Sequence, residues 1–552
     1  MNRLNGFPNY VRQLIKGHLL SNGFSREDLN KPIIGIVNSW SEIVPGHYPL
    51  RELASKVKEG VYKAGGLPLE FNTIAICDGI AQGHKGMNYS LPSRELIADS
   101  IEAVVMGHDI FDGLVFLSSC DKIVPGMLMA MGRIDIPSIW IGAGPMHNLV
   151  KPRDSKSARR AFLEGKISED DLLNVTQLYY PCPGVCPFLG TANTMCIVAE
   201  VLGVGLPGSA LAPAGSAERY QLARLTGEIA VHLSRERLRP SQILTKEAFE
   251  DAIAVLMALG GSLNAVLHIP AIAYELGIEI TLEDFEKIGE EVPLIARVVP
   301  NDDENTVIDL YHSGGVPAVM RELSPLLHLD RRTVSGKTYR EVLEEYRGLG
   351  VRSSIIRPLS DPISKGGSIK ILKGNLAPLG ALLKVSALGR DTPERFEGTA
   401  KVFNSEDEFI DYASKSSIKE GEAIVIRYEG PRGGPGMREL HRCVEIINRY
   451  RNVALVTDGR LSGASYGISV AYVSPEAASG GPIAMVRDGD PVVIDVRNKR
   501  LDLLISQSEY EERMKNLSIQ IEHTFVSKNS YLKYYMRFVQ DSCKGAIRGE
   551  SS

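Results

Sequence analysis

Short apolar runs that alternate with amphipathic segments dominate the first part of the chain, and they constrain its fold more than any other feature. Between residues 31 and 146 these runs are 33–37, 71–76, 114–117 and 136–141. Each is short enough for a buried strand, and intervening segments such as 92–108 have helical periodicity. The pattern is typical of βαβ units and predicts a parallel sheet covered by helices.

The character of the sequence changes after residue 355. The segment 355–367 contains two prolines and a Gly-Gly pair, which indicate a domain boundary. Beyond it, β-branched runs separated by turn residues predict strands at 381–385, 423–428, 453–457, 482–486 and 491–496. We therefore expect an α/β amino-terminal domain over residues 1–355, with a parallel sheet, and a β-barrel-like carboxyl-terminal domain over residues 368–552. Further helices are expected at 155–173, 192–202 and 245–259.

Composition limits the possible classes of function. The 552 residues include 62 Lys and Arg against 67 Asp and Glu, a net charge of −5, so nucleic acid and anionic membranes are not expected partners. No run reaches the roughly 18 apolar residues of a membrane span. The start of the chain does not resemble a secretory signal, so we expect a cytoplasmic protein. In that setting the seven cysteines are expected to be thiols or metal ligands rather than disulfides.

Two predicted strands are followed by loops that carry both thiols and carboxylates. Cys77 and Asp78 follow one apolar run, and Cys120, Asp121 and Lys122 follow another. Because the carboxyl ends of parallel strands converge on one crevice, we expect both loops to face one site. An alternative interpretation is that Asp78 and Asp121 cap the helices that follow them.

A proline-rich turn carries two further cysteines, Cys182 and Cys186. Thiolates held on loops can bind iron or zinc, and Cys120 would complete such a set, although the spacing alone is weak evidence. The remaining cysteines are expected to be small buried apolar residues: Cys196, Cys443 and Cys543.

Two glycine-rich loops in the second domain contain Glu429 and Ser462. Glycines allow a backbone to approach a ligand closely, so these loops could hold a phosphate or place both side chains in a site. Neither loop matches a Walker loop or a dinucleotide-binding fingerprint. Three histidines could be ligands, although histidines with satisfied hydrogen bonds are commoner: His47, His84 and His108.

Assembled in order, these segments resemble the dihydroxy-acid and phosphogluconate dehydratase family, most closely its branch in branched-chain amino-acid synthesis. The matching strings span most of the chain and include NSWSEIVPGH at 38–47, EFNTIAICDGIAQGHKGMNYSLPSRELIADS at 70–100, CDKIVPGMLMA at 120–130, KGNLAP at 373–378, VIRYEGPRGGPGMREL at 425–440 and VALVTDGRLSG at 453–463.

The resemblance implies dehydration of a 2,3-dihydroxy carboxylate to a 2-keto acid. It implies that Cys120 and Cys186 hold an iron–sulfur cluster and that Ser462 is the base. The residues implied to bind Mg²⁺ are Asp78, Asp121, Glu429 and Lys122, the last as a carbamate. This division agrees with the chemistry of the donors, since Mg²⁺ prefers hard oxygen ligands and soft thiolates bind iron.

This sequence departs from the family pattern in three places. Gly46 stands where many relatives have a cysteine that serves as a third cluster ligand, which leaves Cys182 or Cys77 as candidates, or an iron without a thiolate ligand. The proline-rich turn is shorter than in the family, so a 2Fe-2S and a 4Fe-4S cluster both stay open. The string GASYG at 463–467 is similar to that of sugar-acid dehydratases.

The function that these features predict is dehydration of a small dihydroxy acid in valine and isoleucine biosynthesis. One alternative is a sugar-acid (aldonate) dehydratase, because pocket polarity decides between an aliphatic and a polyol tail. A second is a non-catalytic paralogue or an iron–sulfur sensor, although a sensor would not need Glu429, Ser462 and acidic Mg²⁺ ligands. The resemblance also implies a homodimer or homotetramer.

Overall fold

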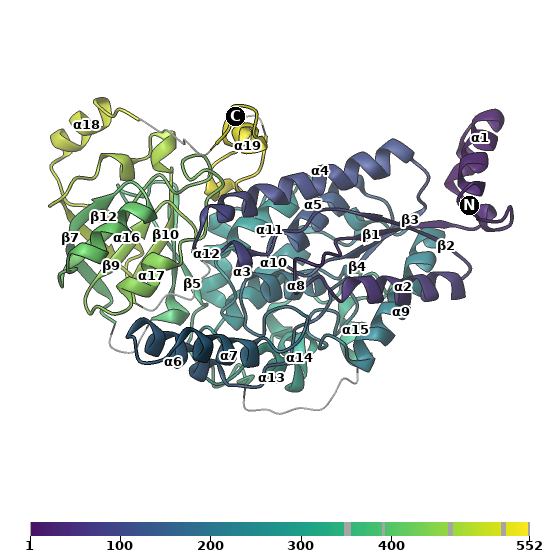
Figure 1. Ribbon diagram of the computed structural model, residues 1–552, viewed down its shortest axis with the longest axis horizontal. Helices are drawn as coiled ribbons and strands as arrows, with labels where there is room; N and C mark the ends of the chain where they lie inside the picture. Colours follow the sequence, from purple (N-terminus) through teal and green to yellow (C-terminus); the bar gives the residue numbers. More distant parts are fainter. Residues whose placement is uncertain (1, 347–354, 389–391, 462–466, 520–525, 550–552) are drawn as a thin grey trace.

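The computed structural model describes residues 2–346, 355–388, 392–461, 467–519 and 526–549, and it contains two sheets (Figure 1). The first sheet is parallel throughout, in the order β2-β1-β3-β4, as predicted. Its strands are β1 (Ile33–Asn38), β2 (Leu67–Asn72), β3 (Gly113–Leu117) and β4 (Ser138–Ile141). The strand expected at 71–76 lies earlier because β2 is an edge strand: it tolerates Pro68 and leaves Glu70 exposed, so no continuous apolar run marks it.

Helices pack on the parallel sheet and on one another. The pair α2 (Leu50–Lys63) and α9 (Ala217–Glu236) pack together, and α9 contacts β3 and β4. A second pair, α4 (Ser90–His108) and α5 (Ile123–Ile134), also pack together. The parallel sheet with packed helices confirms the α/β character of the amino-terminal domain.

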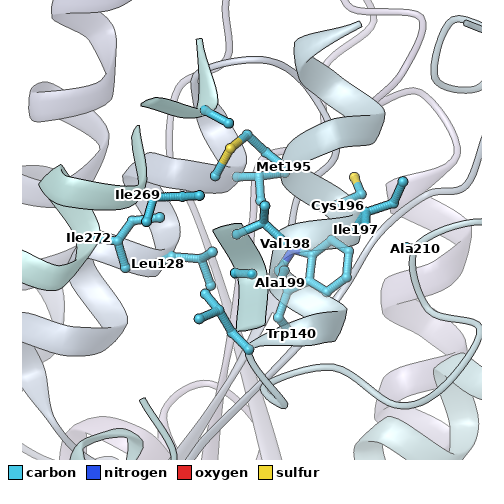
Figure 2. Close-up of a cluster of buried hydrophobic side chains, with 14 of the residues drawn as sticks. Leu128, Trp140, Met195, Cys196, Ile197, Val198, Ala199, Ala210, Ile269 and Ile272 are labelled. Atoms are coloured by element: carbon cyan, nitrogen blue, oxygen red, sulfur yellow. The ribbon is translucent and has the colours of Figure 1, made fainter. Parts of the chain in front are cut away.

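Helix α8 (Thr191–Val201) lies at the centre of this domain, and all of its residues are buried. Figure 2 shows Met195, Cys196 and Val198 of this helix among apolar side chains of its neighbours. Those neighbours include Leu128 of α5 and Trp140 of β4, together with α11 (Ala265–Tyr274). The turn that leads into α8 is hydrogen-bonded to the loops after β1 and β4, from Gly184 N–H to Pro45 O at 3.0 Å and from Val185 N–H to Gly144 O at 2.9 Å.

The second sheet has eight strands in the order β12-β11-β7-β8-β9-β10-β6-β5. The strands β7 to β10 are parallel, and the outer pairs are antiparallel. A bridge between Lys373 and Arg500 joins the two ends of the sheet, which makes it nearly closed and confirms the barrel-like character. The strands are β5 (Ile369–Leu372), β6 (Gly380–Lys384), β7 (Arg395–Phe403), β8 (Glu422–Ile426), β9 (Ala454–Thr457), β10 (Ser469–Ser474), β11 (Pro491–Asp495) and β12 (Arg500–Leu503).

One predicted strand of the barrel is wrong. The run expected as a strand at 482–486 is a 3₁₀ helix, Pro482–Met485, whose Ile483 packs into the barrel core. Pro482 has no backbone N–H to donate to a neighbouring strand, so this apolar run is buried as a short 3₁₀ helix rather than as a strand.

The predicted helices are largely confirmed. The segment 155–173 divides into α6 (Pro152–Leu163) and α7 (Glu169–Tyr179), with Gly165 between them, and 245–259 contains α10 (Lys246–Leu259). The other helices are α1 (Asn9–Leu20), α3 (Asp78–Ala81), α12 (Leu282–Glu291), α13 (Val307–His312), α14 (Gly315–Glu322), α15 (Tyr339–Glu345), α16 (Glu406–Lys415), α17 (Arg442–Ile447), α18 (Gln507–Lys515) and α19 (Tyr531–Phe538). No helix in the described ranges is both long and apolar enough to cross a membrane.

The two domains are docked through backbone contacts beside α4. Asn88 donates to the carbonyls of Gly434 and Pro435 at 2.7 and 2.8 Å, which attaches the loop after β8 to the first domain. The end of the chain returns to the first domain, where Arg94 donates to the carbonyls of Gly545 and Ala546. The loop after β8 therefore lies where the strand ends of the first sheet can meet it.

Candidate functional site

The two strand-end loops of the first sheet come together, as predicted. Lys122 donates to Asp78 at 2.8 Å, and its ammonium group lies 3.9 Å from the Asp121 carboxylate. Asp78 also accepts from the Ser90 hydroxyl at 2.6 Å. The Lys122 side chain has no exposed surface, and these two carboxylates are the anionic groups beside its ammonium group. The alternative role in capping is wrong, because neither α3 nor α5 has a side-chain cap.

The two carboxylates differ in their electrostatics. Burial raises the pKa of Asp121 to about 7, and the neighbouring charge of Asp78 adds to the shift. Burial opposes ionisation of Asp78 as well, but Lys122 and Arg460 outweigh it and lower the pKa of that carboxyl. A divalent cation between the two groups would favour ionisation of both.

The second domain contributes Arg460 and Glu439, which the sequence reasoning did not single out. Arg460 is fully buried, 3.7 Å from Asp78 and 3.1 Å from Glu439, and it donates to the carbonyl of Met437 at 3.0 Å. Glu439 also accepts from Asn264 at 3.0 Å. Both residues lie in the two glycine-rich loops, but the sequence offered no means of choosing between Glu439 and the other acidic residue of its loop.

That other residue, Glu429, belongs to a different ion-pair network. Its two carboxylate oxygens accept from Arg438 at 2.8 and 2.9 Å, and one of them accepts from the backbone N–H of Glu406 at 2.8 Å. Burial raises the pKa of Glu429 to about 7 despite Arg438. No described contact joins it to Asp78 or Lys122. A metal-binding role for Glu429 stays a prediction.

The thiols predicted to bind a cluster lie on the same side of the sheet. Cys120 is 8% exposed, and burial together with the nearby Cys77, Asp121 and Cys186 raises the pKa of its thiol. Burial and then Cys77 raise the pKa of Cys186 to about 12. Cys120 and Cys186 are therefore close enough for their charges to interact, and their role as cluster ligands stays a prediction. As expected, Cys196 and Cys443 are buried, whereas Cys543 is only partly buried.

His47 is hydrogen-bonded to the backbone of the loop that carries Cys120. Its Nε2 accepts the backbone N–H groups of Ser119 and Cys120 at 3.3 and 3.1 Å, and its Nδ1 donates to the carbonyl of Ser39 at 2.8 Å. Burial lowers the pKa of His47 to about 4, which agrees with a neutral ring in these roles. The other two histidines bond to carbonyls of their own turns: His84 to Ile80 and His108 to Val104.

Ser462, the predicted base, lies outside the described residues, as do the residues from 463 to 466. Two residues before Ser462, the side chain of Arg460 lies in the site. The next residue, Leu461, is buried, and its carbonyl accepts from the Tyr472 hydroxyl at 3.4 Å.

The donor sets in the site fit two different metal groups. Asp78, Asp121 and Glu439 supply hard oxygens of the kind that Mg²⁺ prefers, whereas Cys120 and Cys186 supply soft sulfurs suited to iron. Within the described ranges, no three Asp, Glu, His or Cys side chains already surround one metal position. The ammonium of Lys122 lies among the carboxylates instead.

Comparison with known proteins places the chain in one enzyme family. Residues 31–342 match the sequence model of the dihydroxy-acid/6-phosphogluconate dehydratase amino-terminal domain, and residues 354–546 match that of the carboxyl-terminal domain. The chain is 49% identical to the dihydroxy-acid dehydratase of Pyrococcus abyssi over 95% of its length and 96% of that protein. It is 48% identical to the dihydroxy-acid dehydratase of Acetivibrio thermocellus, over 95% of each chain.

Proposed function

Because the chain belongs to the dihydroxy-acid/6-phosphogluconate dehydratase family and is a dehydratase, we propose that it converts 2,3-dihydroxy carboxylates of branched-chain amino-acid synthesis to 2-keto acids. The observation that supports this substrate assignment is the sequence similarity, over nearly the whole chain, to several proteins named dihydroxy-acid dehydratase. The same membership supports a cytoplasmic homodimer or homotetramer.

We propose that the oxygen donors for Mg²⁺ are Asp78, Asp121, Glu439 and a carbamylated Lys122. The Glu439 carboxylate supports this set because Arg460 links it to Asp78, whereas Glu429 is paired with Arg438. Arg460 is the cation that keeps both carboxylates oriented. Glu429 is the alternative fourth donor, and the variants Glu439→Gln and Glu429→Gln separate the two.

Carbamylation of Lys122 would require a bound cation. A lysine forms a carbamate only as a neutral amine, and here the carbamate would be a third anion in a buried position beside two carboxylates. The modification would turn a cation into an anion among Asp78 and Asp121, and a divalent cation would offset the added negative charge.

The reaction requires loss of a proton from C2 and of hydroxide from C3. When bound, Mg²⁺ and the iron–sulfur cluster each supply a Lewis acid for this elimination. We propose that Ser462 accepts the C2 proton; a serine hydroxyl needs nearby positive charge or hydrogen-bond donors to act in this way, and the buried guanidinium of Arg460 lies two residues before it. The C2–H electron pair forms the C2–C3 double bond as hydroxide leaves, and the enol then tautomerises to the keto acid without oxidation.

Replacement of Ser462 by alanine tests the base. We expect Ser462→Ala to keep the visible absorption of the cluster and to lower turnover at least about 10²-fold, the usual effect of removing a general base. A turnover close to that of the wild type would rule out this role.

The substrate is tested by measuring 2-keto-acid formation with anaerobically purified protein and Mg²⁺. We expect activity on 2,3-dihydroxyisovalerate and little on arabinonate, xylonate or gluconate. The string at 463–467 favours the aldonates as the second candidate, so a preference for them would replace the aliphatic substrate. Protein with a full complement of iron and sulfide but no activity on any of these acids would contradict the proposed function.

A further inference from the structure

We propose that Asn264 and Tyr472 form a hydrogen-bonded pair that positions Arg460 and Glu439 of the second domain against the strand-end loops of the first. Both are positioning residues, because neither is proposed to touch the substrate or a metal. The inference rests on the proposed function, since that function gives Glu439 and the segment around Arg460 their roles in the dehydration. It adds the contact that holds these side chains in place across the two domains.

Asn264 is fully buried immediately before α11, in the first domain. Asparagine is among the residues that most often cap a helix with their side chain. Among the described residues, however, its side chain forms no capping hydrogen bond to α11. The amide instead bonds to segments far away in the sequence, and a residue that departs from its usual local role in this way is expected at a functional site.

The amide of Asn264 has three side-chain partners in three different segments. Its Nδ2 group donates to the Thr191 hydroxyl at 2.7 Å and to the Glu439 carboxylate at 3.0 Å. Its Oδ1 atom accepts from the hydroxyl of Tyr472. These partners lie 73, 175 and 208 residues away along the chain, and Glu439 and Tyr472 belong to the second domain. A single buried amide therefore joins the two domains within the site.

The contact with Glu439 reaches the proposed oxygen donors. Glu439 accepts from Arg460 at 3.1 Å as well as from Asn264, and the Arg460 guanidinium lies 3.7 Å from Asp78. The Glu439 carboxylate is thus held by an amide of the first domain and by a guanidinium of the second. Carboxylates that bind metals are themselves oriented by hydrogen bonds of this kind.

Tyr472 contacts the segment that contains Arg460 at two points. Its backbone N–H donates to the carbonyl of Gly459 at 3.0 Å, and its hydroxyl lies 3.4 Å from the carbonyl oxygen of Leu461. Arg460 therefore stands between two residues that Tyr472 contacts. Because Asn264 holds the same hydroxyl, the position of this segment depends on the first domain.

The backbone of Tyr472 supports a functional role for these contacts. Its φ of +58° lies in the left-handed region, which is unfavourable for a bulky residue. The pairing of β10 with β6 is irregular at this point, between Ala471 and Ser474. Strained residues persist where the surrounding structure holds them, and they are concentrated at active sites. We attribute this conformation to the buried contacts that Tyr472 makes with Asn264 and with residues 459–461.

The third partner connects the pair to the turn that carries Cys186. Thr191 begins α8, and its hydroxyl also bonds to that of Ser262 at 2.9 Å. Two residues later, Asn193 donates to the carbonyl of Cys186 at 2.7 Å. Asn264 therefore links the second domain to the start of the helix that follows this proposed cluster ligand.

Tyr472→Phe is the first test, because it removes only the hydroxyl and keeps the buried ring. At saturating Mg²⁺ we expect kcat to fall by about 10–10²-fold, since a misplacement of about 1 Å can cost 10²-fold. KM and the visible absorption of the cluster should stay close to those of the wild type. A purely structural role would lower stability and leave kcat unchanged, so a kcat close to that of the wild type would overturn the inference.

Asn301→Ala is the matched control. Asn301 is also an asparagine of the first domain that contacts the barrel: it donates to the carbonyl of Gly260 at 2.7 Å and accepts from the Ser386 hydroxyl at 3.5 Å. We expect this variant to keep the wild-type kcat. A loss as large as that of Tyr472→Phe would show that any weakened contact between the domains lowers turnover, which would contradict a specific role for the pair.

Asn264→Ser tests the pair from the other side, with a readout that does not depend on turnover. Because Glu439 loses its amide donor, we expect Mg²⁺ to bind the anaerobic holoprotein about 10–100-fold more weakly, measured by titration calorimetry. Tyr472→Phe should leave this affinity unchanged. An unchanged affinity in Asn264→Ser would overturn the inference, and if this variant does not fold, the comparison of Tyr472→Phe with Asn301→Ala decides alone.

The double variant Asn264→Ser with Tyr472→Phe shows whether the two residues act together. Residues that share one hydrogen bond are coupled, so the loss of kcat in the double variant should be smaller than the product of the two single losses. Losses that simply multiply would mean that the residues act independently, which would contradict the pair.

These tests separate the inference from the proposed function. A wild-type protein that forms no 2-keto acid from any of the acids tested would overturn both. An active wild type whose turnover is matched by Tyr472→Phe and by Asn264→Ser would overturn the role of the pair alone.

Discussion

The two domains supply the site in different ways. In the first domain, Cys120 and Asp121 stand close behind the end of β3, and Asp78 begins the short helix that follows β2. In the second domain, Glu439 comes well after the end of β8 at Ile426, on a loop whose path is set by contacts with the first domain. A side chain near a strand end is positioned mainly by the sheet, whereas the position of a side chain far along a loop depends on all the contacts that the loop makes.

That difference predicts how each half responds to substitution. Substitutions at the strand ends should directly lower turnover and weaken the buried ion pair of Lys122. Substitutions along the loop after β8 should act by altering the conformation of that loop and the packing of the two domains. Four experiments, ordered from the largest expected effect to the smallest, test this contrast.

Asp78→Asn removes a charge from the strand-end half. We expect turnover to fall at least about 10²-fold, as for loss of an electrostatic group that stabilises a transition state. The buried ammonium of Lys122 loses its nearest carboxylate, so the free energy of unfolding should fall by up to about 3–5 kcal/mol. Denaturant unfolding measures the second effect. Asp330→Asn, at an exposed ion pair of the same domain, should cost less than about 1 kcal/mol, and an equal cost would contradict the contrast.

Glu439→Gln and Glu429→Gln compare the two acidic residues of the loop after β8. We expect Glu439→Gln to raise the Mg²⁺ concentration for half-maximal activity by about 10–100-fold. Glu429→Gln should leave that concentration nearly unchanged and lower stability, because Arg438 loses a two-bond partner. Titration of activity with Mg²⁺ decides between them, and the reverse order of effects would assign the metal site to Glu429.

Gly436→Ala tests the docking of that loop. Gly436 has φ +75°, and a Cβ atom there would lie 2.1 Å from the carbonyl oxygen of Asn88. Gly421 has a similar φ of +81° but open space around it. We expect Gly421→Ala to cost about 1 kcal/mol of stability from backbone strain alone, and Gly436→Ala about 1–3 kcal/mol more from the clash. Similar midpoints of thermal unfolding would show that the close approach does not hold the domains together.

The pH dependence of stability should have opposite signs in the two halves. Burial, and then Asp458, raise the pKa of Glu476 to about 8, so the folded state holds this proton more tightly than the unfolded state between about pH 4.5 and 8. Stability from this group is full below that window and falls as pH rises through it, by at most about 1.4 kcal/mol per pH unit.

For Asp78 the pKa is lowered, so its contribution is present above the unfolded value and is lost as pH falls. The difference in unfolding free energy between the wild type and Glu476→Gln, followed from pH 5 to 8, measures the Glu476 effect. A difference that does not change with pH would contradict it.

The same contrast explains what could be predicted from the sequence. The convergence of the two strand-end loops, with Cys120 and Asp121, followed from the alternation of strands and helices, because parallel strands end at one edge. The shift of β2 was missed because an edge strand needs no continuous apolar run. Glu439 and Arg460 could not be chosen from the sequence, since their proximity to Asp78 depends on how two domains dock, which no local pattern encodes.

The order of these residues along the chain has a consequence for maturation. Cys120, Cys186 and every strand of the parallel sheet are encoded before α9, whereas the carboxylate of Glu439 arrives only with the barrel. As the ribosome releases the chain from its amino terminus, the proposed sulfur ligands would be present long before the proposed oxygen ligands are complete. If the proposed metals are bound, iron delivery could therefore precede closure of the enzyme, and magnesium loading would await it.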